Sequence, residues 1–136
     1  MNYTEWLASC PDSLKKDPLW KFTAYPKSLW LFDITWQDCE RLKQSIQGKA
    51  LLNQLIRSVD SISANIDEGF GRGVERQEYV YYLRIALGST RETRSRYFKL
   101  RHSLPKDVVE HRMELCNEII ALLITAINKH RPKNKK

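Results

Sequence analysis

The chain has 136 residues, of which 42% are hydrophobic and 29% are charged, values typical of one compact and well-solvated domain. Its 5 glycines and 5 prolines argue against a turn-rich β fold and against wholesale disorder. There is no apolar run of about 18–20 residues, which excludes a membrane-spanning helix. Because the N-terminus also lacks the basic and apolar regions of a signal peptide, we expect a cytoplasmic protein.

The net charge of +7 is concentrated in two segments. Residues 72–101 hold eight Lys or Arg and three acids, and residues 129–136 hold five Lys or Arg and no acid, so each segment carries +5 while the rest sums to −3. Seven of the eight basic residues in 72–101 are Arg, which favours bidentate contacts with phosphate or carboxylate. This distribution predicts a polyanionic partner. The alternative is a solubilising surface with a frayed terminus.

The first predicted helix spans residues 18–43 and follows an N-terminal arm, residues 1–16. Asp17 and Pro18 match an N-cap followed by proline at the first helical position. Pro26 lies inside the stretch, so it should either kink the helix or mark its true start. In the latter case the segment before Tyr25 is a separate arm.

Four tryptophans lie in this N-terminal part of the chain. Trp30 and Trp36 fall in the apolar helix and are predicted to belong to the core. Trp6 and Trp20 lie nearer the N-terminus, where they are equally consistent with interface anchors. Base stacking is the functional alternative for all four.

The second predicted helix spans residues 49–68. Its apolar residues step by 3, 4, 3 and 4, the a/d pattern of a helix packed in a bundle: Leu52, Leu55, Val59, Ile62 and Ile66. Gly69, Gly71 and Gly73 follow and are predicted to end the helix and turn the chain. Arg72 lies among these glycines, where it could contact a phosphate.

The third predicted helix spans residues 74–102 and has two distinct faces. One broad face carries small residues in its middle (Ala86, Gly88 and Ser89), which should let a neighbouring helix approach closely. The second face mixes apolar residues with arginines, a composition that suits a subunit interface or a nucleic-acid groove: Val80, Leu87 and Phe98 with Arg84, Arg91 and Arg94.

The fourth predicted helix begins at Pro105 and spans residues 105–129. Its apolar stripe is wide, so it should be buried on more than one side, and Arg112 lies within that stripe. A basic tail, residues 131–136, follows the bundle of residues 17–130. Short connections make sequential helices antiparallel neighbours, so the sequence predicts an all-α, up-down-up-down four-helix bundle.

No constellation of residues suggests catalysis, a metal site or a cofactor. The three histidines show no metal-ligand spacing, and the three cysteines are too scattered for a disulfide framework or a zinc site. Asp60, Asp67 and Glu68 form an acidic group that we expect to pair with arginines of the third helix. Glu92 is expected to pair with Arg96 at i, i+4.

The segments SISANIDEGFGRG (61–73) and YYLRIALGSTRE (81–92) resemble the bacterial 23S ribosomal RNA intervening-sequence proteins, also called four helix bundle proteins. The resemblance implies a non-enzymatic bundle that assembles as a ring-shaped homopentamer. A related branch is the accessory variability determinant of diversity-generating retroelements, which partners a reverse transcriptase and binds nucleic acid. The motif residues, interpreted as a structural signature, are Ser61, Asn65, Glu68, Gly69, Gly88, Ser89 and Glu92.

We therefore expect a basic, oligomeric accessory protein that binds RNA or DNA, a nucleic-acid enzyme, or both. The alternative is a structural homo-oligomeric interaction module with no nucleic-acid role. The candidate nucleic-acid-binding residues are Arg72, Arg76, Arg84, Arg91, Arg94, Arg96, Lys99, Arg101, Lys129, Arg131 and Lys133.

Overall fold

The computed structural model describes residues 1–131, and all regular structure within them is helical. The elements are, in chain order, α1 (Tyr3–Ser9), α2 (Asp12–Lys15), the 3-10 helix η1 (Pro18–Lys21), α3 (Ala24–Leu42), α4 (Ile46–Arg72), α5 (Gln77–Lys99), the 3-10 helix η2 (Leu100–His102) and α6 (Lys106–His130). The all-α class predicted from the sequence is confirmed. No helix in this part of the chain has the length and apolar content needed to cross a bilayer.

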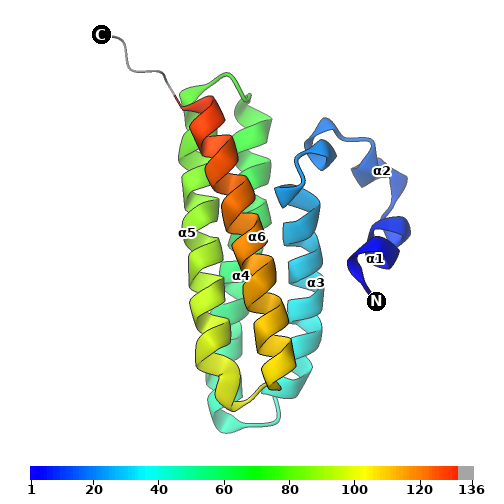
Figure 1. The fold of residues 1–136 in the computed structure, drawn as a ribbon, viewed down its shortest axis with the longest axis vertical. Helices are drawn as coiled ribbons and strands as arrows, with labels where there is room; N and C mark the ends of the chain where they lie inside the picture. The colour runs from blue at the N-terminus through cyan, green and yellow to red at the C-terminus, as the bar shows by residue number, and fades with distance from the viewer. Residues whose placement is uncertain (132–136) are drawn as a thin grey trace.

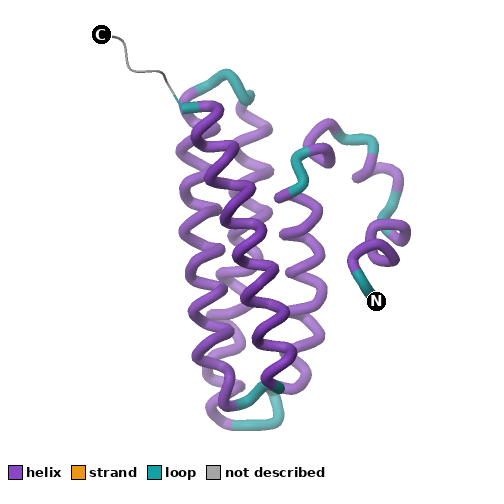
Figure 2. The backbone as a smooth tube through the Cα atoms, in the orientation of Figure 1, coloured by secondary structure: helices purple, strands orange, loops and turns teal. Residues whose placement is uncertain are grey.

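The helices α3, α4, α5 and α6 lie side by side as long rods, with the N-terminal arm against α3 (Figure 1). Both α3 and α5 contact α4 and α6, so α3 and α5 lie diagonally across the assembly. Short loops join consecutive long helices at alternate ends (Figure 2). The outward faces of α3 and α5 therefore point in different directions.

The long helix α3 begins at Ala24 and not at residue 18. Pro26 lies in its first turn, where the backbone N–H that proline lacks would have no intrahelical partner. Pro26 thus marks the start of the helix and does not kink it. The predicted cap is present but serves η1, because the Asp17 side chain accepts a hydrogen bond from the Leu19 amide.

The helix α4 is longer than predicted at its C-terminal end. Gly69 and Gly71 lie inside it, and only Gly73, whose φ is 108°, ends it. A positive φ of this size is readily adopted by glycine alone. The interpretation of all three glycines as a helix stop was therefore wrong for the first two. At the other end, the Ser45 hydroxyl caps the helix by accepting from the Gly48 amide.

The bounds of the last two helices differ from the predictions by a few residues. The helix α5 begins at Gln77, three residues after the predicted start, and its last turn passes into η2. Pro105 is the N-cap residue of α6 and not its first helical residue. Val80, predicted on the mixed outer face of α5, is buried instead.

A continuous apolar core fills the space between the four long helices. The seam predicted on α4 points into it: Leu55, Val59, Ile62 and Ile66 are fully buried, while Leu52 is half-buried against it. Cys39 and Cys116 are buried thiols, and burial raises the pKa of the Cys116 thiol to about 12. Both behave as small apolar residues in the core.

The N-terminal arm packs on α3 through stacked aromatic rings. The indole of Trp6 is stacked with the rings of Tyr3 and Trp20, with centroid separations of 6.1 and 6.2 Å, and the buried Trp30 packs against Tyr3. Trp36, predicted to be a core residue, is 61% exposed. It occupies the outward face of α3, because apolar bulk alone does not give a residue's angular position on a helix.

Candidate nucleic-acid interface

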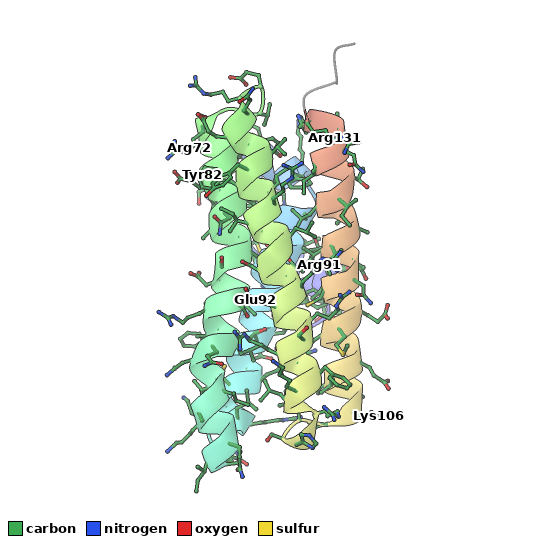
Figure 3. All side chains as sticks on the ribbon, turned by 90° about the vertical axis from the view of Figure 1, so that its left-hand side faces the viewer. Arg72, Tyr82, Arg91, Glu92, Lys106 and Arg131 are labelled. Atoms are coloured by element: carbon green, nitrogen blue, oxygen red, sulfur yellow. The ribbon has the colours of Figure 1, made fainter. Side chains whose placement is uncertain are left out.

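The outward face of α5 is basic, with three exposed cations and no acidic residue along one row. Exposed residues recur along it in steps of four, three, four and four, which keeps them on one face of a helix: Arg84, Gly88, Arg91, Ser95 and Lys99. Figure 3 looks onto this helix, with α4 on one side and α6 on the other. We call these five residues the α5 outer face.

Small polar residues between α4 and α5 fix the position of this face. The Ser89 hydroxyl donates to the Ser61 hydroxyl at 2.8 Å, and the Thr93 hydroxyl donates to the Ser58 hydroxyl at 3.0 Å. Small side chains let the two helix backbones approach closely, and the hydrogen bonds satisfy polar groups that burial would otherwise leave unpaired. The two contacts set the rotation of α5, and with it the direction of the outer face.

Arg84 and Arg91 are exposed and have no acidic partner within the described residues 1–131. Between them lies Gly88, where an added Cβ would meet no atom within 4 Å. The helix backbone is therefore open to close approach from outside, with a guanidinium on each side. Gly88 does not serve helix packing within the chain, contrary to what the sequence predicted.

A shallow groove of about 320 Å³ runs along this face. Its lining comes entirely from α5, because the small residues Gly88 and Ser95 leave a depression between longer side chains: Gly88, Arg91, Glu92, Ser95, Arg96 and Lys99. Arg91 and Glu92 lie on opposite flanks of the helix, toward α6 and α4 respectively (Figure 3). Glu92 is the one acidic member of a lining that holds three cations.

Two arginines of α5 bridge to the neighbouring helices. Arg94 donates to the Asn117 side-chain oxygen on α6 at 2.8 Å, and Arg96 donates to the Gln54 side-chain oxygen on α4 at 2.9 Å. Arg96 also lies 3.9 Å from Glu92, the predicted i, i+4 pair. Part of the charge of Arg96 is thus used within the chain, unlike that of Arg84 and Arg91.

A second group of basic residues lies at the end of the bundle where α4 and α6 end. Arg72 pairs with Glu68 of its own helix at 2.9 Å and lies over the Tyr82 ring at 5.2 Å. The hydrogen bond to Glu68 raises the pKa of Arg72. Arg76 pairs with Glu78 at 3.2 Å. Asp60, Asp67 and Glu68 were predicted to pair with arginines of the third helix, and within residues 1–131 none of them forms an ion pair with α5, so that prediction was wrong.

The remaining candidate nucleic-acid-binding residues lie at both ends of the bundle. Arg101 lies over the Phe98 ring at 4.1 Å at one end of the bundle, whereas Lys129 and Arg131 are exposed at the other, where Figure 3 shows Arg131. Lys133 lies outside the described residues. The structure thus distributes the predicted cations over the α5 outer face and both ends of the bundle.

The motif residues on α4 have packing roles. The Asn65 amide donates to the Ser61 carbonyl at 2.7 Å and to its hydroxyl at 2.9 Å. At Gly69 an added Cβ would lie 2.9 Å from the Tyr82 Cβ, so this glycine allows α4 and α5 to approach closely. The close contact predicted for the motif is therefore made at Gly69 and Ser89, and not at Gly88.

Sequence reasoning missed a buried polar network between α3, α5 and α6. Arg112 donates two hydrogen bonds to the Asp38 carboxylate, at 2.8 and 3.0 Å, and the Tyr97 hydroxyl donates to the same carboxylate at 2.7 Å. Burial, and then the charge of Asp38, raise the pKa of Tyr97 well above its ordinary value. The available signal was Arg112 itself, since a charge inside an apolar stripe requires a partner.

The candidate site supplies charged side chains that can bind a ligand. Within residues 1–131 no group of three or more His, Cys, Asp or Glu side chains is placed to hold a metal ion. The outer face of α5 presents guanidinium groups that are unpaired within the described residues, and such groups are suited to charge-assisted hydrogen bonds with anions.

Comparison with known proteins gives one family match. The sequence pattern of the family described as 23S rRNA-intervening sequence protein matches residues 21–125, from just before α3 to near the end of α6. Comparisons with curated proteins and with solved structures gave no match. The family match includes α3, α4, α5 and most of α6, and it begins after the N-terminal arm. The chain belongs to the 23S rRNA-intervening sequence protein family.

Proposed function

We propose that this chain is a non-enzymatic protein that binds nucleic acid through the outer face of α5. The observation that carries the proposal is the pair of exposed arginines, Arg84 and Arg91, on either side of Gly88, with no acidic partner in the described chain. Each unpaired arginine at a surface is a candidate phosphate contact, and phosphate contacts supply most of the affinity of sequence-independent binding.

Exposed aromatic residues beside the α5 outer face favour single-stranded nucleic acid as the ligand, because its bases are accessible. Tyr81 and Phe98 are 60% and 49% exposed on α5, one near each end of the arginine row. Exposed aromatic rings next to basic grooves stack on the bases of single-stranded nucleic acid. A single strand that follows α5 would place phosphates at Arg84 and Arg91 and bases against these two rings.

The assembly state is part of the proposal. We propose an up-down-up-down four-helix bundle that assembles as a ring-shaped homopentamer, so that several α5 faces act together on one nucleic acid. Repeated weak contacts on one ligand raise the overall affinity without new chemistry. An accessory role beside a nucleic-acid enzyme, such as a reverse transcriptase, would use the same face to hold that enzyme's template.

A second candidate function rests on Gly88. An open glycine flanked by Arg84 and Arg91 also suits a helix of another subunit, in which case the α5 outer face is an interface between copies of the chain and nucleic acid is not bound. Charge reversal of both arginines would then break the oligomer.

Fluorescence anisotropy with labelled RNA and DNA oligonucleotides at two salt concentrations tests the proposal. The full chain should bind, with an affinity that falls as salt rises. Arg84→Glu with Arg91→Glu should weaken binding at least about tenfold, and should reduce the steepness of the salt dependence by roughly 1.5, as the loss of two phosphate contacts requires.

The matched control is Lys16→Glu with Lys49→Glu, which changes the net charge equally at exposed positions outside α5. It should weaken binding much less. If the control and the α5 variant have the same effect, net charge and not the α5 face is responsible, and the proposal is wrong. Absence of binding at low salt, with an oligomer that the α5 variant dissociates, would favour the second candidate.

A further inference from the structure

The outward face of α3 carries large aromatic side chains among polar residues, whereas that of α5 is basic. Trp36 is 61% exposed, and its ring lies 6.2 Å from that of Phe32, one helical turn away. Leu14 of the arm is 37% exposed close by. Large apolar side chains gathered on one surface mark an interaction site more often than isolated ones do.

A carboxylate lies in the middle of this aromatic surface. Asp33 is exposed on α3 and accepts a hydrogen bond from the Trp6 indole nitrogen at 2.7 Å through one of its two oxygens. No cation of the described residues lies within ion-pair distance of it. The indole holds the carboxylate in one position, and its second oxygen is free to accept.

Two hollows meet at Asp33. One, of about 370 Å³, extends past Trp36, and the other, of about 280 Å³, extends past Phe32 and Leu14. Both are also lined by Trp6 and Ser9 of the arm. A side chain entering either hollow therefore reaches the same carboxylate.

The aromatic rings differ in what they can offer a ligand. The Trp6 ring is stacked with Tyr3 and with Trp20 and is buried, and its N–H donates to Asp33. The Trp36 ring has Phe32 as an aromatic neighbour, and its side chain is 61% exposed. A planar cation over this exposed indole would gain a cation–π contact and, from Asp33, an ion pair.

We propose that this surface, which we call the Asp33 site, binds an arginine side chain of a protein partner. Guanidinium fits better than ammonium because it is planar, stacks on indole rings and donates in a fork to a carboxylate. A protein side chain is the expected source, because tryptophan and arginine dominate the central contacts of protein interfaces. The negative carboxylate and the positive partner complement each other in a partly water-excluded setting.

The Asp33 site is independent of the proposed nucleic-acid interface. The helices α3 and α5 lie diagonally across the bundle, so both faces can be occupied at once. Trp6 and Ser9 precede the matched family region, residues 21–125. The site thus depends on a part of this chain that the family pattern does not include.

Fluorine NMR of the full chain labelled with 5-fluorotryptophan tests the proposal. The ligand probes are acetylated, amidated Gly-Arg-Gly and the same peptide with citrulline, which has nearly the same shape without the charge. The resonance of Trp36, assigned with Trp36→Phe, should shift on titration with the arginine peptide. The citrulline peptide should bind at least about fivefold more weakly, the ratio expected for loss of a cation–π contact and an exposed ion pair.

Asp33→Asn is the second test. The asparagine oxygen can still accept a hydrogen bond from Trp6, so the N-terminal arm should stay in place. This substitution should weaken binding of the arginine peptide by about fivefold and leave the citrulline peptide unaffected. Asp107→Asn removes an exposed carboxylate at the start of α6 and should change neither titration.

Three outcomes would overturn the proposal. Equal shifts with both peptides would make the surface an apolar patch, and no shift with either would remove the site altogether. If light scattering shows that Asp33→Asn alone dissociates an oligomer of the chain, the arginine comes from a second copy and not from a different protein. None of these outcomes bears on nucleic-acid binding at α5.

Discussion

Charges in this molecule occur in two settings that differ in whether they have partners. Between α3 and α6, the buried Asp38 forms a bidentate pair with Arg112, whose side chain is 14% exposed. On the outer face of α5, Arg84 and Arg91 are exposed and unpaired within the described chain. Charges of the first kind are tied to folding, because each would be costly alone. Charges of the second kind contribute little to folding and remain available to a ligand.

Breaking the buried pair should have the largest effect. Asp38→Ala leaves the Arg112 guanidinium and the Tyr97 hydroxyl without their acceptor, which costs about 3–5 kcal/mol of unfolding free energy. Urea denaturation followed by circular dichroism measures this. Replacing both partners by apolar residues, Asp38→Leu with Arg112→Met, should cost much less than Asp38→Ala alone. A loss below about 1 kcal/mol for Asp38→Ala would contradict the structural role.

Urea denaturation also measures how little the exposed arginines of α5 contribute to the free energy of unfolding. Arg84→Ala with Arg91→Ala should leave the free energy of unfolding within about 0.5 kcal/mol of the wild type, as expected for exposed surface positions. A clearly larger loss would mean that these arginines have partners in the folded protein. It would also weaken the proposal that Arg84 and Arg91 are available to bind a polyanion.

Two glycines on neighbouring helices should respond in opposite directions to the same substitution. Gly69→Ala forces a Cβ to within 2.9 Å of the Tyr82 Cβ, and overpacking of this kind costs about 1–3 kcal/mol. Gly88→Ala meets no atom within 4 Å and should stabilise the monomeric fold by about 0.5–1 kcal/mol through helix propensity. Thermal unfolding compares the two. Destabilisation by Gly88→Ala that depends on protein concentration would place another subunit against Gly88.

The long helices and much of the core could be predicted from the sequence because they follow from periodicity. The steps of Leu55, Val59, Ile62 and Ile66 give one face of α4, and that face is buried. The predictions for Trp36, Gly69 and Gly71 were wrong for physical reasons. Residue type does not specify which side of a helix an aromatic ring occupies, and glycine is tolerated inside a helix when packing requires a small residue.

The candidate site was predictable as one face of the third helix, but the sequence could not show which of its arginines are unpaired. Charge counts identify residues 72–101, yet they cannot separate Arg84, which is unpaired, from Arg94, which bridges to Asn117. That distinction depends on which residues of α4 and α6 lie opposite each position of α5. The Asp33 site could not be predicted at all, because it requires the arm to fold back and bring Trp6 to α3.

The basic tail should contribute less to nucleic-acid binding than the α5 outer face. Removal of residues 131–136 eliminates four Lys or Arg, the same change in net charge as Arg84→Glu with Arg91→Glu. If position on a rigid surface matters, the truncation should weaken binding only a few-fold, against about tenfold or more for the double variant. Anisotropy at one salt concentration compares them. The opposite ranking would make the tail the main contact.

The smallest expected effect concerns His111, which adjoins the buried pair. Its ring packs edge-on against Trp30 at 5.5 Å, and a ring nitrogen lies 2.7 Å from the Arg112 guanidinium. Partial burial, and then the charge of Arg112, lower the pKa of His111 below its ordinary value of 6.5; Asp38 and Glu118 act in the opposite direction but do not cancel this effect.

A lowered pKa means that the folded state resists protonation of His111 while the unfolded state accepts the proton near pH 6.5. The contribution of neutral His111 to the free energy of unfolding is therefore fully present above pH 6.5. It is lost as the pH falls through the folded-state pKa. Thermal unfolding between about pH 7.5 and 5.5 should show a lower melting temperature at the acidic end. His111→Gln should make this dependence shallower, since glutamine cannot take up the proton beside Arg112. An unchanged pH dependence in that variant would show that another group takes up the proton. It would also show that Asp38 cancels the effect of the Arg112 charge on His111.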